Sequence, residues 1–118
     1  MNLFPIGKYL FATVFLVFGA LHLMNAGAMA EMVPSMFPGG ILLVYITGLA
    51  MIGYAAAIYT GRYAKLASQL LALMLIIFVL TIHLPNAMAG NPGQMLKDLG
   101  LAAGALILGN NYNEGPGL

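Results

Sequence analysis

The sequence predicts an all-α protein, an integral membrane bundle of four transmembrane helices that forms one domain over residues 1–118. Composition is the first reason, because 62% of the residues are hydrophobic and only 6% are charged. A soluble domain carries about 25% charged residues. Hydropathy is the second reason, because four apolar segments approach the roughly 20 residues that cross the hydrocarbon core of a bilayer. The composition excludes a soluble domain and also a disordered chain, which combines low hydrophobicity with high charge.

The four segments are separated by prolines and glycines that interrupt helices. We expect transmembrane helices at about residues 6–29, 40–60, 66–84 and 93–112. The first segment ends in Ala28-Met29-Ala30, which imitates a signal-peptide cleavage site. Its apolar run is longer than a signal peptide needs, so we expect a membrane helix there. The second segment carries no charge, and the polar points of the third include Ser68, Thr81 and His83.

The fourth segment is the least apolar, because its uninterrupted run covers only residues 99–108. Lys97 and Asp98 precede that run, so they must lie at a membrane interface or face the bundle. We expect both side chains to extend to the lipid headgroups. Gly100 and Gly104 follow at a spacing that lets membrane helices approach closely, either within the bundle or between the copies of a homo-oligomer.

The basic residues predict the orientation of the helices in the membrane. Lys8, Arg62 and Lys65 fall on one side of a four-span topology, and Lys97 falls on the other side. Because cytoplasmic segments carry the excess of Lys and Arg, we place both termini and the Arg62 loop in the cytoplasm. The loops that contain Glu31 and Asn91 then face outward.

Several function classes are excluded by residue types that the chain lacks. A net charge of +1 argues against a nucleic-acid partner, which requires clustered Lys and Arg. The absence of cysteine removes disulfides, thiol relays, iron–sulfur clusters and thiolate metal sites. No phosphate-binding loop, nucleophile elbow or dinucleotide fingerprint is present. We therefore assign no catalytic residue and no metal site, and do not expect an enzyme that acts alone.

An internal repeat links the first two segments to the last two. At an offset of 61 residues, His22-Leu23-Met24-Asn25-Ala26 matches His83-Leu84-Pro85-Asn86-Ala87, and the same offset pairs Gly48 with Gly109. This pattern predicts two copies of one helical hairpin, related by a pseudo-two-fold axis along the membrane normal. The two histidines would then lie at equal depth near the outer surface.

The outer end of the bundle holds the candidate site. We expect a polar site there that binds a cofactor and is formed by His22, His83, Glu31, Lys97, Asn25 and Asn86. A histidine pair at such a depth could hold a quinone through proton-carrying hydrogen bonds, could ligate a haem axially, or could ligate a metal. The alternative is structural, because polar side chains also form hydrogen bonds between neighbouring membrane helices.

The chain resembles the DoxX family of small bacterial membrane proteins. The resemblance extends over nearly all of it, and its motifs are Gly19-Ala20-Leu21-His22, Met32-Val33-Pro34, Tyr45-Ile46-Thr47-Gly48 and the stretch from Leu96 to Leu106. Asp98 replaces the asparagine that is commoner in the last motif.

The resemblance implies a multi-pass, four-helix bundle of the bacterial inner (plasma) membrane that is associated with quinone-linked redox systems. It implies an accessory subunit with a membrane oxidoreductase as partner, and it assigns no catalytic residue. The alternative function, which the wider superfamily also implies, is a non-catalytic membrane scaffold or an assembly or chaperone-like protein.

Overall fold

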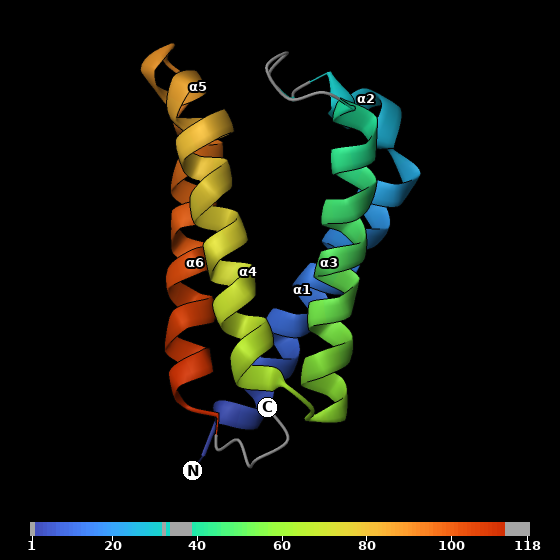
Figure 1. The fold of residues 1–118 in the computed structure, drawn as a ribbon. Helices are drawn as coiled ribbons and strands as arrows, with labels where there is room; N and C mark the ends of the chain where they lie inside the picture. Colours follow the sequence, from blue (N-terminus) through green and yellow to red (C-terminus); the bar gives the residue numbers. More distant parts are fainter. Residues whose placement is uncertain (1, 32, 34–38, 113–118) are drawn as a thin grey trace. The chain divides into compact units, whose positions relative to one another are not determined.

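The computed structural model describes residues 2–31, 33 and 39–112, and these divide into two compact units. The first unit extends to Ala64 and the second begins at Lys65. All regular secondary structure in the described residues is helical, which confirms the all-α class (Figure 1).

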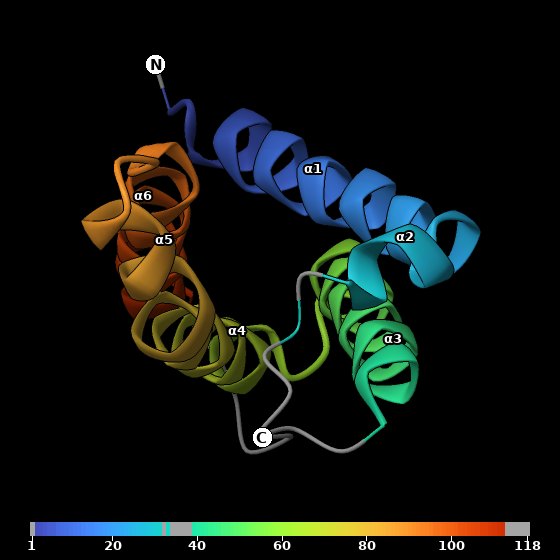
Figure 2. The same cartoon turned by 90° about the horizontal axis from the view of Figure 1, so that it is seen from above.

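The first unit is a helical hairpin of α1 (Phe4–Met24) and α3 (Gly40–Thr60), joined through the short helix α2 (Ala26–Ala30). Pro5 stands in the first turn of α1, where its missing N–H is not needed. Gly39 and Gly61 flank α3 with φ of 70° and 71°, a left-handed conformation that suits glycine. Figure 2 shows α2 turned across the end of α1 toward α3, so the helix expected over 6–29 is interrupted at Asn25.

Aromatic rings pack between α1 and α3 in one part of this hairpin, and glycines let the two helices come into close contact in another part. The Phe15 and Tyr54 rings pack edge to face with centroids 5.6 Å apart, and Phe15 is fully buried. Farther along, a Cβ atom built on Gly19 would lie 2.6 Å from the backbone oxygen of Gly48. The two backbones therefore approach as closely as small residues allow.

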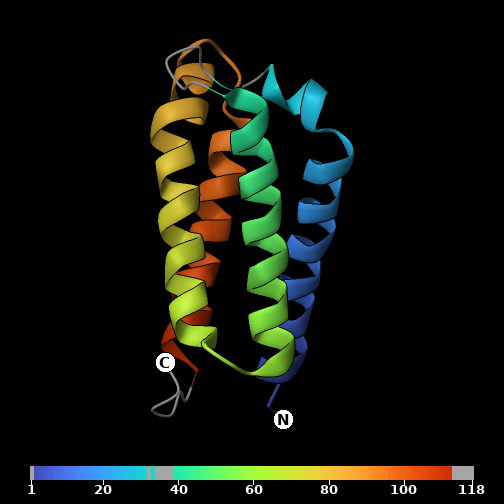
Figure 3. The ribbon, with the colours of Figure 1, turned by 45° about the vertical axis from the view of Figure 1, so that its right-hand side comes forward.

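The second unit is also a hairpin, in which a long helix changes its winding before the turn. It consists of α4 (Ala64–Phe78), the π-helical turn η1 (Val79–His83), the short helix α5 (Leu84–Met88) and α6 (Gly93–Asn110) (Figure 3). The Leu84 N–H donates to Val79 O, five residues earlier, as in a π-helix. Pro85 follows, and its ring would clash with the carbonyl four residues earlier in an α-helix, which the wider winding relieves.

Three helices are long and apolar enough to cross a membrane, namely Phe4–Met24, Gly40–Thr60 and Ala64–His83. They agree with a protein that associates with a lipid bilayer. The segment expected to be the fourth span forms α6, which does not reach the same length and hydropathy, because its first half carries Gln94, Lys97 and Asp98. A fourth crossing therefore remains a prediction.

Candidate functional site

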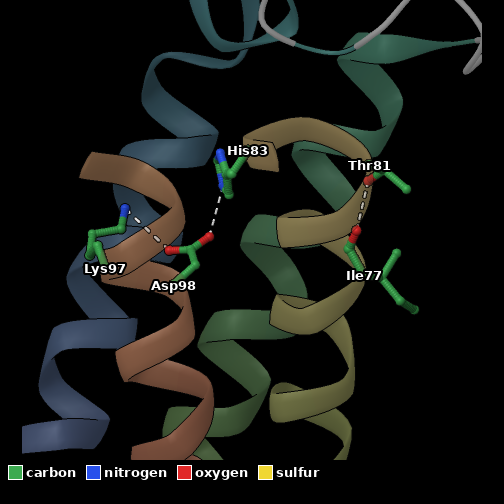
Figure 4. A network of polar contacts seen from close by, with 5 residues as sticks. All are labelled: Ile77, Thr81, His83, Lys97 and Asp98. Carbon is green, nitrogen blue, oxygen red and sulfur yellow. Dashed lines mark hydrogen bonds and ion pairs between the residues drawn. The ribbon is translucent and has the colours of Figure 1, made fainter. Parts of the chain in front are cut away.

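A buried hydrogen bond between a histidine and a carboxylate joins the two long helical segments of the second unit. His83 Nε2 lies 2.8 Å from Asp98 Oδ2, and Lys97 Nζ lies 3.4 Å from Asp98 Oδ1 (Figure 4). The side chains of His83 and Asp98 are only 11% and 8% exposed, whereas Lys97 is 45% exposed. We call these three residues the His83 cluster.

The helical winding places His83 toward α6. His83 is the last residue of η1, and a π turn holds one more residue than an α turn, so it rotates the following side chains relative to those of α4. The nearby Thr81 hydroxyl donates to Ile77 O at 2.8 Å and points away from the cluster in Figure 4. The cluster therefore depends on His83 and on two consecutive residues of α6.

The geometry fixes which ring nitrogen of His83 carries a proton. A carboxylate oxygen only accepts hydrogen bonds, so the Nε2–H of His83 donates to Asp98. In the neutral ring Nδ1 then holds a lone pair. This nitrogen is buried and has no hydrogen-bond partner among the described residues. A buried acceptor of this kind is costly, which makes it a candidate contact for a ligand.

His22 is arranged differently from His83. Its Nδ1 lies 2.7 Å from Phe18 O. Because a carbonyl only accepts, Nδ1 carries the proton and donates to the backbone of its own helix. Opposite it in α3 stands Gly48, whose built Cβ would lie 2.9 Å from His22 Cβ. The first hairpin thus has a glycine beside its histidine, where the second has Asp98.

The other expected site residues belong mostly to the first unit. Glu31 is exposed and ends α2, and the Asn25 side chain donates to Leu21 O at 3.0 Å, so both lie in the first unit with His22. The side chain of Asn86 lies outside the described part of the structure. Within the second unit, the structure brings His83 and Lys97 together through Asp98. The pairing of His22 with His83 stays a prediction.

The expectation that Asp98 extends to the headgroups is wrong, because its carboxylate is buried against His83. Lys97 fits that expectation better, since nearly half of its side chain is exposed. The sequence did contain a signal that Asp98 faces inward. An acidic group in an apolar helix needs a partner, and His83 is a polar group of the preceding helix. The choice between headgroup and bundle depended on the winding near Pro85, which no short pattern predicts.

The cluster fits some of the expected ligands better than others. In the described part of the chain, no three His, Asp or Glu side chains gather to hold a metal ion. Haem ligation through His83 Nε2 does not fit, because that nitrogen donates to Asp98. The groups of the cluster that could meet a ligand are the buried Nδ1 of His83 and the Lys97 ammonium.

A family model described as "Domain of unknown function (DUF8561)" matches residues 11–104, a range that includes both histidines and Asp98. No curated protein and no solved structure matches the chain. Since the matched range covers most of its length, the chain belongs to the DUF8561 family.

Proposed function

We propose that this chain is a multi-pass protein of the bacterial plasma membrane that binds a quinone headgroup at the His83 cluster. It would act as an accessory subunit of a quinone-linked membrane oxidoreductase. The observation that carries the proposal is the buried Nδ1 of His83, which lacks a partner within the described residues while Asp98 holds the opposite side of the ring. The resemblance to the DoxX family supports a quinone as the ligand.

The membrane placement has support from one end of the first unit. There Lys8 Nζ lies 5.0 Å from the centroid of the Tyr9 ring, which stacks on Tyr59. Arg62 follows the same end of α3 and is exposed. Tyrosines and basic side chains gather at membrane interfaces, and the basic excess is cytoplasmic. We therefore propose that this end faces the cytoplasm and that α6 is a fourth span.

Each residue of the cluster has a distinct part in binding. Asp98 holds the His83 ring in one orientation and balances the charge of Lys97. His83 and Lys97 offer hydrogen-bonding atoms to the oxygens of the headgroup. A quinone has a lipid-soluble tail, so it can reach such a site from the bilayer. When bound, a quinone would supply the redox chemistry, which this chain's own residues do not.

A non-catalytic scaffold or assembly protein is the second candidate, and the contact between His83 and Asp98 favours it. The His83–Asp98 contact joins η1 to α6 and would fix the hairpin without any ligand. In that case the cluster would matter for stability alone, as polar contacts between membrane helices often do.

Native mass spectrometry of the detergent-purified protein separates the two candidates. We expect the wild-type protein to retain a quinone, and the His83→Gln and Asp98→Asn variants to lose it. His22→Gln is the matched control, because His22 bonds within its own helix, and it should retain the ligand.

Two results would contradict the proposal. If all variants retain the same small molecules, the cluster does not hold the ligand. If the wild-type protein carries only phospholipid after purification from a quinone-containing membrane, and added quinone does not bind, the scaffold is the better account.

A further inference from the structure

The unpartnered nitrogen of His83 bears on which redox form of the ligand the site prefers. We propose that the His83 cluster binds the hydroquinone, which carries hydroxyl groups, more tightly than the quinone, which carries carbonyls. This inference rests on the proposed function and adds a preference between the two forms. It follows from three properties of the cluster: the tautomer of His83, the charge balance and the burial of Nδ1.

The tautomer makes Nδ1 an acceptor. Asp98 Oδ2, 2.8 Å from Nε2, cannot donate when ionised, so the ring proton lies on Nε2. Neutral imidazole carries one proton, which leaves a lone pair on Nδ1.

Lys97 balances the charge of Asp98 within the cluster. Its Nζ lies 3.4 Å from Oδ1, so the carboxylate already has a cation beside it, and the cluster has no net charge when His83 is neutral.

Burial turns the acceptor into a selective contact. Nδ1 is shielded from solvent and has no partner among the described residues, so a ligand atom that donates to it would satisfy it. A hydroquinone hydroxyl donates to it, whereas a quinone carbonyl would place a second lone pair against it. Lys97 does not discriminate, because an ammonium only donates and both forms have oxygens that accept. An unsatisfied buried acceptor weakens binding by about tenfold or more, so we expect a preference of that size.

Equilibrium binding to the full-length protein in detergent, under argon, tests the inference. The probes are decylbenzoquinone and its hydroquinone, each measured separately. We expect the wild-type protein and the His22→Gln control to bind the hydroquinone about tenfold more tightly. His83→Gln should bind both forms more weakly than the wild type and without the preference, because an amide both donates and accepts. Nitrogen NMR should show the hydroquinone shifting the His83 Nδ1 signal and leaving His22 unchanged.

The outcomes distinguish the inference from the function on which it rests. Equal affinities of the wild-type protein, or tighter binding of the quinone, would overturn the inference and leave the quinone site standing. Binding of neither form above the level found in empty micelles would overturn the proposed function, and the inference with it. The affinities of the wild-type protein for the two forms decide between these outcomes, even if a variant does not fold.

Discussion

Replacement of Asp98 by leucine is expected to lower the free energy of unfolding by about 1–3 kcal/mol, the cost of leaving a buried hydrogen-bond donor without its acceptor. The variant leaves the His83 Nε2–H and the Lys97 ammonium without the carboxylate that both contact. Lys97 can turn to the headgroups, because its side chain is already half exposed, but His83 is held inside. Unfolding by SDS titration in mixed micelles measures the difference.

The double variant His83→Leu/Asp98→Leu shows why the pair is present. Replacing both partners of a buried hydrogen bond by apolar side chains is often nearly neutral or stabilising, so we expect the double variant to recover most of the loss. That recovery, together with lost quinone binding, would mean that the pair serves a ligand rather than the fold. A double variant as unstable as Asp98→Leu would favour the scaffold. A single variant with unchanged stability would contradict the buried pair itself.

Gly19→Ala is expected to destabilise the first hairpin by about 1–3 kcal/mol through overpacking. The added Cβ would lie 2.6 Å from Gly48 O and 2.6 Å from Ile52 Cγ1. The Ile52 side chain can rotate, but the Gly48 oxygen belongs to the backbone of α3, so the two helices must separate. The same SDS titration measures the effect.

Gly53→Ala is the matched control for this prediction. It lies in α3, and a Cβ there would meet nothing within 4 Å. We expect its stability to stay within about 1 kcal/mol of the wild type, with any change favouring the helix. Equal losses in Gly19→Ala and Gly53→Ala would show that the close contact between α1 and α3 does not form.

The all-helical class and the apolar spans follow from composition and run length, which are properties of the whole chain. The helix over 40–60 is also readily predicted, because Gly39 and Gly61 mark its ends. The interruption at Asn25 and the π turn before His83 are local backbone events that hydropathy does not register. The partner of His83 depended on the second of these events.

The internal repeat of the sequence does not predict which glycines are equivalent in the two hairpins. The gapless match pairs Gly48 with Gly109, yet Gly48 lies beside His22 and a Cβ on Gly109 would lie 3.0 Å from Ser68 Cβ. These two glycines are therefore not equivalent in the structure. The connector before α6, residues 89–92, is shorter than the one before α3, residues 31–39. In the second hairpin Asp98 lies beside His83, where the first hairpin has Gly48 beside His22.

The two histidines carry the ring proton on opposite nitrogens, so that the acceptor is the buried Nδ1 in His83 and Nε2 in His22. Nitrogen NMR of the protein labelled at its histidine rings tests this directly, since the chain has only two histidines and His22→Gln assigns them. We expect opposite neutral tautomers, with the proton on Nε2 of His83 and on Nδ1 of His22. The same tautomer at both positions, or a proton on Nδ1 of His83, would contradict the account.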